Sequence, residues 1–540
     1  MSSTDIKELW RGFTAELDYA VFGAGFLVTA LAVLAFAFRD EAAADLMHGI
    51  NDALWVNLGW AYLLVMFVLV LFVGFLVFGP WGNITLGEDG EEPAFSFPAY
   101  FAMLYSAGIA AGIVFWGPAE AIFHFDSVSP FIGAESGTPE AAVGAIQYTF
   151  FHWGISAWTA YVVLGIPIAY YGHRYGAPLR VSTILAPWLG IDDLDRPLAK
   201  VVDVLAVFAT IGGVAATLGF VGDQFLVGLE WTTGTTVGDL GTILIITGLT
   251  VAFTISVALG VKKGIRRLSY FNLALFLLLL GATFVLGPTR YIMAVGTEAL
   301  GGYINQFITM SFYTGADAGT GASVSAWVGE WTVFYWAWWF SWAPFVGLFI
   351  ARISRGRTVR QVAVTGVVAS TGVTIPWFAT MGGSAIFFQQ TGQADILSVV
   401  SNLGEAGSGY PLFESMPLGG LLTAMFLVLV TTFFVTSADS STLALGLLTT
   451  GGKREPSTIN RVVWGFLIGA LASLLMVTGG VDALQAAAII TGGPFAIITL
   501  LAVVSMVLAF GNRNSIFLRE EDDVTVPGSK STFDESVADD

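Results

Sequence analysis

Three closely spaced aromatic residues, Trp153, Trp158 and Tyr161, could bind an organic cation. On a helix that turns about 100° per residue, they fall within an arc of about 140°. Aromatic faces hold a quaternary ammonium by cation–π attraction, which needs no hydrogen bond and no counter-charge. The same spacing also suits ordinary helix packing, so the pattern alone leaves both interpretations open.

A second concentration of aromatic residues begins the segment 331–360, which ends in four arginines. Its tryptophans are Trp331, Trp336, Trp338, Trp339 and Trp342. Such a segment is either a membrane helix that packs its rings against neighbours or lipid, or part of a binding site. Composition favours neither interpretation.

Residues 106–118 combine several helix-weakening positions in one apolar stretch. Gly108 and Gly112 lower helix stability, and Pro118 lacks a backbone hydrogen-bond donor. The stretch could therefore be interrupted, with free carbonyls facing a cavity. Alternatively, the two glycines form a small-residue face for close helix packing.

Hydroxyl groups cluster shortly after Phe433, in Thr436-Ser437-Ala438-Asp439-Ser440-Ser441-Thr442. In an apolar helix they either bond the preceding turn and neighbouring helices or act as oxygen ligands for a small cation. Asp439 is notable because an ionisable group at membrane depth is costly and usually functional. Near the end of its helix it would instead be solvated by water.

Little in the sequence indicates an enzyme. There is no cysteine, and the histidines show no metal-ligand spacing; they are His48, His124, His152 and His173. Residues 451–454 lack the upstream glycine and the hydroxyl that a phosphate-binding loop requires. The remaining acids of interest lie near predicted helix ends, namely Glu120, Asp203, Asp223 and Glu330. We therefore expect no catalytic site.

The composition is that of a membrane protein. Of 540 residues, 55% are hydrophobic and only 11% are charged, which is too apolar for a soluble fold of this length. Apolar runs of about 20 residues match the hydrocarbon core, and strand-like alternation is absent. The net charge of −18 comes from acids in loops and tails, which favours a solvated acidic surface over an acid-rich binding site. We predict an all-α integral membrane protein.

Twelve transmembrane helices are predicted from the apolar runs. They cover residues 19–38, 57–79, 97–120, 143–171, 200–228, 239–260, 269–289, 327–351, 362–386, 417–449, 460–480 and 485–510. With both termini in the cytoplasm, only Arg39 and Arg290 of the 22 lysines and arginines face outward, as the positive-inside rule requires. Residues 1–18 form a cytoplasmic segment without a cleavable signal, 291–326 an outer amphipathic connection, and 512–540 a disordered acidic cytoplasmic tail.

The segment 334–358 closely resembles the eighth-helix signature of the betaine/choline/carnitine transporter family. The matching residues are Phe334-Tyr335-Trp336-Ala337-Trp338-Trp339, Ser341-Trp342, Pro344-Phe345-Val346-Gly347 and Ala351-Arg352-Ile353-Ser354-Arg355-Gly356-Arg357-Thr358. The resemblance extends over essentially all twelve spans. It implies two helices at 19–79, then inverted five-helix repeats at 97–289 and 327–510. The third and eighth spans are expected to be interrupted around a midplane site. This is the fold shared with sodium-coupled amine and amino-acid transporters, and family members are commonly homotrimers.

The resemblance also implies a substrate site. A cage for a trimethylammonium group falls on four residues, with Trp338 and Trp342 beside them. The cage residues are Trp153, Trp158, Tyr161 and Trp339. The carboxylate of a betaine would meet backbone groups around Gly108–Gly112, where the methyl group of Ala110 narrows the pocket. Gly112 stands where choline-selective relatives have aspartate, which favours a zwitterion such as glycine betaine.

Sodium ligands follow from the same resemblance. One ion falls on the main-chain oxygens of Ser106 and Ile109 together with residues of the tenth span, which are Phe433, Thr436 and Ser437. A second family position falls on Thr210, Val214 and Phe345, but Val214 offers no side-chain oxygen, which argues against an ion there. Sodium-independent exchangers of the family lack the Thr436–Ser437 hydroxyl pair, so its presence predicts sodium coupling.

Together these features predict a plasma-membrane symporter that imports glycine betaine or a related quaternary-ammonium compatible solute with sodium, for osmoprotection. Its expected partners are the substrate, sodium, membrane lipid and copies of itself in a homotrimer. No cofactor other than Na⁺ and no nucleic acid is expected. Two alternatives stay open: sodium-independent exchange of carnitine- or choline-like solutes, and a betaine-binding osmosensor or channel.

Overall fold

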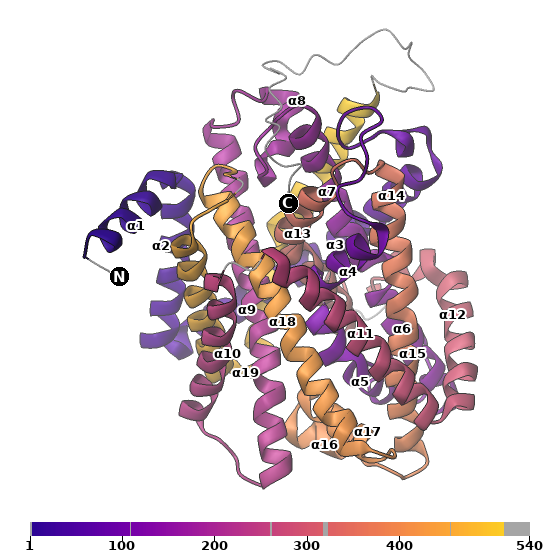
Figure 1. Ribbon diagram of the computed structural model, residues 1–540. Helices are drawn as coiled ribbons and strands as arrows, with labels where there is room; N and C mark the ends of the chain where they lie inside the picture. The colour runs from indigo at the N-terminus through magenta and orange to yellow at the C-terminus, as the bar shows by residue number, and fades with distance from the viewer. Residues whose placement is uncertain (1–2, 109, 260–261, 317–321, 454, 512–540) are drawn as a thin grey trace.

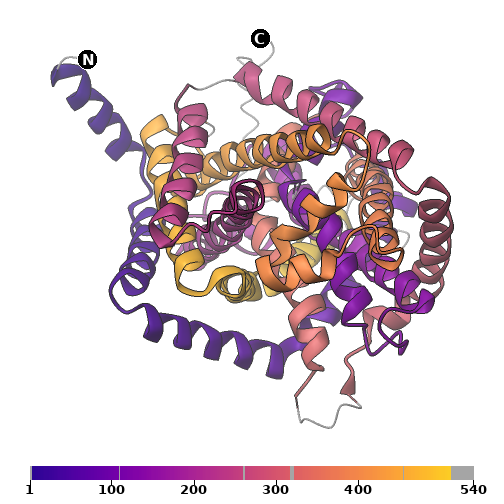
Figure 2. The same cartoon turned by 90° about the horizontal axis from the view of Figure 1, so that it is seen from below.

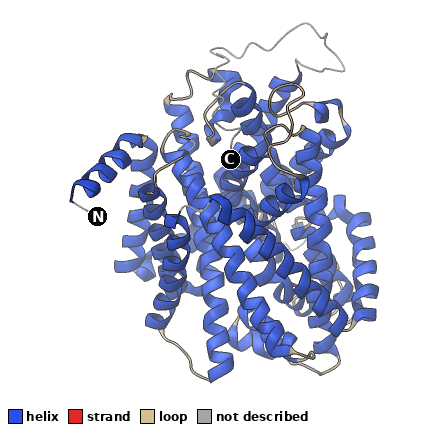
Figure 3. Ribbon diagram, viewed as in Figure 1, coloured by secondary structure: helices blue, strands red, loops and turns tan. Residues whose placement is uncertain are grey.

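The computed structural model describes residues 3–108, 110–259, 262–316, 322–453 and 455–511 (Figure 1). Within these ranges the chain is helical and has no strand, apart from an isolated antiparallel bridge between Thr85 and Thr358 (Figure 3). The sodium position assigned to Ile109 and the expected tail 512–540 lie outside the described residues. The connection 291–326 is described only in part.

The α-helices follow one another with short connections. They are α1 (Ser3–Glu16), α2 (Tyr19–Phe38), α3 (Asp40–Phe78), α4 (Phe97–Ala107), α5 (Ala110–Asp126), α6 (Pro139–Trp153), α7 (Ile155–Arg174), α8 (Ala186–Leu189), α9 (Pro197–Thr233), α10 (Asp239–Leu259), α11 (Lys262–Leu286), α12 (Thr289–Ser311), α13 (Phe334–Ile353), α14 (Val359–Ala363), α15 (Ser370–Gln390), α16 (Ile396–Leu403), α17 (Gly409–Glu414), α18 (Gly419–Thr449) and α19 (Thr458–Gly511). Short 3₁₀ turns are η1 (Pro80–Asn83), η2 (Val181–Leu185) and η6 (Glu405–Ser408), and π-helical turns are η4 (Val328–Val333) and η5 (Val364–Ala369).

Ten of the described helices are long and apolar enough to cross a membrane, and the bent pair α4–α5 raises that number to eleven. The prediction of an all-helical chain rich in membrane-spanning segments is confirmed. Helix α3 begins at Asp40, well before the span predicted at 57–79, and Asp40 and Glu41 in its first turn favour a helix N-terminus there. The 54-residue α19 contains non-helical backbone at Gly479 and Gly480, so it consists of two helices joined at a kink.

Among the described residues two spans are interrupted, the third, as expected, and the fourth, which was not expected. The third is broken at Gly108, and α4 and α5 meet at an angle of 62°. The expected interruption of the eighth span is wrong, because η4 and α13 form one continuous helix through Pro344. A membrane helix tolerates proline where neighbouring groups satisfy the freed carbonyl. The fourth span is instead interrupted at Gly154, whose φ of −81° and ψ of −137° separate α6 from α7.

The aromatic helix α13 forms the core of the molecule. The most apolar stretch of the η4–α13 span is 100% buried, whereas that of α2 is only 22% buried. A helix that is apolar on every side must be covered by other helices, and α13 packs against α7, α9 and α19. Viewed from below, α2 and the start of α3 lie at the edge of the molecule (Figure 2). The aromatic segment is therefore the element around which the other helices assemble.

The arginines that follow α13 hold the loop between α3 and α4 in place at the upper end of Figure 1. Arg355 pairs with Glu91 at 2.5 Å, and Arg357 donates to the Phe95 carbonyl at 2.7 Å. Arg360 donates to carbonyls at the end of α3, including that of Val77 at 2.7 Å. These bonds fix the end of α13 relative to α4, the helix that leads into the Gly108 break.

Candidate substrate and ion site

The break after α4 is covered by the ring of Trp158. A Cβ atom at Gly108 would lie 2.6 Å from Cζ3 of Trp158, so only glycine lets the indole ring approach the backbone this closely. On its other side, the Trp158 ring stacks on Tyr105 of α4 with centroids 5.3 Å apart. An aromatic surface from α7 therefore lies directly against the interrupted backbone.

Three oxygen atoms converge at the same break. The Ser437 hydroxyl of α18 lies 3.4 Å from the carbonyl oxygens of both Ser106 and Gly108. A hydroxyl has one hydrogen, so it cannot fully satisfy both carbonyls. Unwound backbone carbonyls beside a hydroxyl are the oxygen donors with which interrupted membrane helices coordinate small cations.

The neighbouring hydroxyl of Thr436 is held differently. It donates to the Thr432 carbonyl at 2.7 Å and accepts from the Asn272 amide of α11, also at 2.7 Å. One lone pair of Thr436 remains for an ion. Phe433 packs against Tyr105 of α4, with ring centroids 6.5 Å apart. Asn272 was not identified from the sequence, although a lone amide in the apolar stretch 269–289 was a signal for it.

The four expected cage residues separate into two pairs. Trp153 and Trp339 lie 4.8 Å apart between ring centroids, and Trp158 and Tyr161 lie 6.1 Å apart. No ring contact between the two pairs occurs in the part of the chain that the structure describes. The 100° arithmetic that put Trp153, Trp158 and Tyr161 on one arc assumed a continuous helix, and Gly154 interrupts that helix between the two tryptophans.

The pairs also differ in their hydrogen bonds. The indole of Trp153 donates to Oε2 of Glu120, and that of Trp339 donates to the His152 carbonyl at 3.1 Å. We call these two residues the bonded pair. In contrast, Nε1 of Trp158 and the hydroxyl of Tyr161 are buried with no hydrogen-bond partner among the described residues. We call these the unbonded pair.

The residues beside the cage show the same contrast. Trp342 donates to the Gly213 carbonyl of α9 at 3.0 Å, whereas Nε1 of Trp338 is buried without a partner in the described ranges. Trp338 stacks on Trp339 with centroids 5.3 Å apart. Buried polar groups are costly unless something hydrogen-bonds them, so the unbonded atoms mark positions that a ligand or water would fill.

The remaining expected contacts lie on either side of this region. Gly112 is buried inside α5, past the break, and the side chain of Ala110 is outside the described residues. For the second ion, Thr210 is fully buried on α9, and its hydroxyl has no partner within the described part of the chain. Phe345 is fully buried on α13 against Trp342, with centroids 4.8 Å apart.

The burial of Glu120 with two histidines was not predicted from the sequence, whereas a buried Asp439 was one of the two alternatives left open. Glu120, expected near a helix end, is fully buried inside α5 and contacts two histidines whose sequence spacing gave no signal. Nitrogen and oxygen atoms of Glu120, His124 and His152 all lie within 4.8 Å of one another. Only tertiary packing brings α5 and α6 together at this point. Asp439 is also buried, where it pairs with Arg461 of α19.

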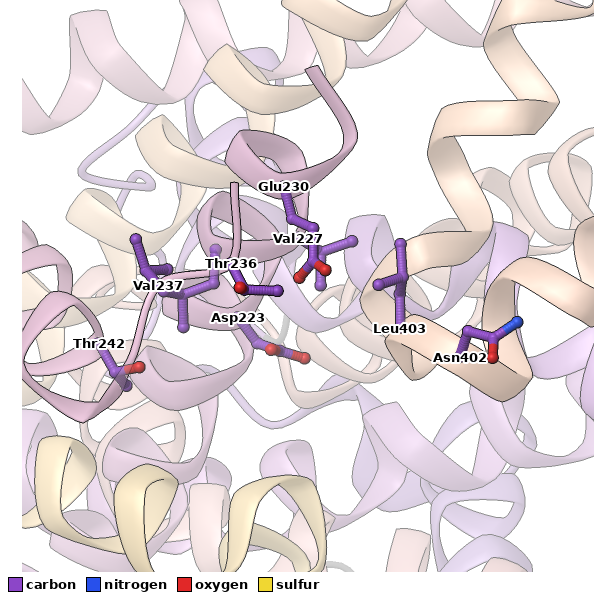
Figure 4. A pocket seen from close by; sticks show the side chains of 9 residues that line it. Asp223, Val227, Glu230, Thr236, Val237, Thr242, Asn402 and Leu403 are labelled. Carbon is purple, nitrogen blue, oxygen red and sulfur yellow. The ribbon is translucent and has the colours of Figure 1, made fainter. Parts of the chain in front are cut away.

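A separate cavity of about 370 Å³ lies between α9, α10 and α16 (Figure 4). Asp223 and Glu230 of α9 line it, and Asn402 and Leu403 of α16 form its opposite side. Asp223 is only 8% exposed, although the sequence indicated a solvated helix end. The cavity is distinct from the Gly108 break in both its helices and its lining residues.

Comparison with known sequences gives the class of the protein. The profile described as betaine/carnitine/choline family transporter matches residues 20–515. The chain is therefore a multi-pass membrane transporter and not an enzyme, as predicted. It is 38% identical over 488 residues to the glycine betaine transporter OpuD of Bacillus subtilis (strain 168), covering 90% of this chain and 93% of that protein. The chain belongs to the betaine/carnitine/choline transporter family.

A second relative is consistent with this membership. The chain is 37% identical over 454 residues to an ectoine/hydroxyectoine transporter of Virgibacillus pantothenticus, covering 83% of this chain and 88% of that protein. A solved structure of a sodium-coupled sialic acid symporter matches with a TM-score of 0.43 and 14% identity, covering 84% of this chain and 86% of that one.

Proposed function

We propose that this protein imports glycine betaine, or a closely related compatible solute, together with sodium. The observation that carries the proposal is the meeting, at Gly108, of an aromatic ring and a group of oxygen atoms. The ring of Trp158 lies against Gly108, and the carbonyl oxygen of Gly108 lies 3.4 Å from the Ser437 hydroxyl. The similar proteins named for glycine betaine and for ectoine support this substrate class.

In this proposal the ammonium group lies between the bonded and the unbonded pair. Four aromatic rings would surround a cation that cannot donate a hydrogen bond. The carboxylate of the substrate would face the break at Gly108, near the free polar atoms of Trp158 and Tyr161. Gly112, which adds no negative charge, is compatible with a zwitterion.

Sodium would connect the substrate site at Gly108 with α18. Bound to Ser437 and to the carbonyls of Ser106 and Gly108, the ion would hold α18 against the break. It would thereby fix the position of Gly108 under Trp158 and raise substrate affinity. The unpartnered hydroxyl of Thr210 supports a second ion, whereas Val214 argues against it.

The proposed architecture has twelve crossings. A helix of 54 residues is about 81 Å long, far more than the ~30 Å hydrocarbon core, so α19 would cross twice and turn at Gly479–Gly480. The bent pair α4–α5 adds one span to the ten candidates, and dividing α19 into two adds another, which gives twelve. We further propose that residues 97–289 and 327–510 form inverted repeats and that the protein is a homotrimer with a role in osmoprotection. It would lie in the plasma membrane with both termini in the cytoplasm.

Uptake by proteoliposomes tests the proposal. Radiolabelled glycine betaine should accumulate against its gradient when sodium is outside and should not when potassium replaces sodium. Unlabelled choline, carnitine, ectoine and proline then rank the substrates by competition. Accumulation independent of sodium would contradict symport, and counterflow without a sodium gradient would support an exchanger. Equilibration without accumulation would indicate a channel.

A further inference from the structure

The cluster of Glu120, His124 and His152 lies behind the bonded pair and carries charge into the middle of the molecule. None of the three side chains is more than 1% exposed. Oε1 of Glu120 is 2.7 Å from Nδ1 of His152 and 3.1 Å from Nε2 of His124, and Oε2 accepts the indole hydrogen of Trp153. The carboxylate is thus one indole ring away from the proposed ammonium position.

With Glu120 ionised, the hydrogen bonds define one arrangement of protons in this cluster. An ionised carboxylate only accepts, so both histidine nitrogens that face Glu120 carry hydrogen. On neutral His152 the other nitrogen then accepts from the Thr332 hydroxyl, which lies 3.0 Å away. On neutral His124 the other nitrogen, Nδ1, is a buried lone pair with no partner in the described residues. In this state the cluster has a net charge of −1.

One more proton has a defined place to bind. His124 Nδ1 is a free acceptor, and the indole rings of Trp331 and Trp327 lie 4.5 and 5.0 Å from the His124 ring, where they can stabilise a cation. Protonation would bring the cluster to zero net charge, and a buried negative charge favours that change. The 2.7 Å separation of Glu120 and His152 is a hydrogen bond. Two ligands of one zinc ion would lie about 3.3 Å apart, so the geometry favours a proton over a metal.

We propose that Glu120, His124 and His152 form a proton-binding site that controls the affinity of the aromatic cage for the ammonium group of the substrate. The inference rests on the proposed function, because it requires a cationic group at Trp153. With the site deprotonated, the charge of Glu120 attracts that cation through the bonded indole. With the site protonated, this attraction is lost. By linkage, substrate binding expels the proton to the same extent.

Other ionisable groups face the cluster from the helices packed against it. Tyr148 lies 6.0 Å from the His124 ring and Tyr335 lies 4.7 Å from the His152 ring, and both remain neutral in the relevant pH range. Helix α15, which packs on α5 and α6, contains no ionisable residue. Two further elements packed on α5 carry acids: η6 carries Glu405, and α9 carries Asp223, which lines the separate cavity of Figure 4. Burial, assisted by the charge of Asp482, raises the pKa of Glu405, so this residue needs its own control.

Equilibrium binding of radiolabelled glycine betaine to the purified full-length protein, at constant sodium, tests the inference. The wild-type Kd should rise about tenfold as the pH falls from about 8 to about 5. Glu120→Gln should bind weakly at both pH values, since the charge is gone. His124→Gln keeps a donor for Glu120 but lacks the second ring nitrogen, so it should bind tightly at both. Glu330→Gln, which changes an exposed acid of η4, and Glu405→Gln should keep the wild-type pH profile.

The outcomes separate the two proposals. A wild-type Kd that does not change with pH, or pH dependence retained in both cluster variants, overturns the proton site while leaving the transport proposal intact. Loss of the pH dependence only in Glu405→Gln also overturns it. Wild-type affinity that depends on added zinc or on a chelator would identify a metal site instead. Absence of any betaine binding by the wild type overturns both proposals. If Glu120→Gln fails to fold in a thermal unfolding assay, His124→Gln still decides the question.

Discussion

The bonded pair and the unbonded pair contain the same kinds of side chain but are built differently. The indole N–H groups of Trp153 and Trp339 donate to Glu120 and to the His152 carbonyl, respectively, so the protein itself fixes the orientation of both rings. Trp158 and Tyr161 are equally buried, yet their polar atoms have no partner among the described residues. In the proposed function, one pair would form a fixed wall, whereas the other would adjust to the substrate bound at the Gly108 break.

The largest effect is expected at Gly108, on which the unbonded pair depends. In Gly108→Ala the new methyl group would lie 2.6 Å from the Trp158 ring and must displace it. Because a displacement of about 1 Å in a site can cost about a hundredfold in rate, we expect glycine betaine uptake to fall by that order. Gly74→Ala is the matched control, since a Cβ there meets nothing within 4 Å. Equal uptake by the two variants would refute a functional role of the break.

A smaller effect is expected at Ser437, the side chain that joins α18 to the break. Ser437→Ala removes one oxygen from the proposed ion site, and a polar contact to a charge is worth about 1.5–3 kcal/mol. The sodium concentration for half-maximal uptake should therefore rise about tenfold or more. Ser440→Ala provides the comparison, because its hydroxyl donates only to the Thr436 carbonyl of its own helix, at 2.9 Å. If both variants keep the wild-type sodium dependence, the ion does not bind at Ser437.

Some of these features could be read from the sequence because they depend on local chemistry. Apolar runs of sufficient length predicted most helices, and the glycines at 108 and 112 indicated an interruption that occurs at the first of them. The interruption at Gly154 was missed, since a single glycine inside an apolar run is compatible with a continuous helix. The family resemblance implied a second broken span, the eighth, but that helix continues through Pro344 in the structure.

Features that depend on tertiary contacts could not be predicted. Glu120 and His152 are far apart in the chain, and no periodicity relates them, yet their side chains are 2.7 Å apart. Likewise, the division of the cage residues into pairs follows from which carbonyls and carboxylates lie within reach of each ring. Spacing and the family resemblance identified the aromatic residues, whereas their hydrogen bonds, which distinguish the bonded from the unbonded pair, required the structure.

The smallest effect, and the most direct test of the contrast, compares two tyrosine hydroxyls. The Tyr161 hydroxyl has no partner in the described part of the chain, whereas that of Tyr303 accepts the Ile155 backbone N–H at 3.3 Å, at the start of α7. Tyr161→Phe should therefore leave the melting temperature unchanged and weaken betaine binding about threefold, since only a ligand or water loses a contact. Tyr303→Phe should lose about 1 kcal/mol of stability and keep its affinity. Thermal unfolding and equilibrium binding on both variants measure the two quantities. The reverse pattern would mean that the Tyr161 hydroxyl serves the fold, and the unbonded pair would then be part of the fixed wall.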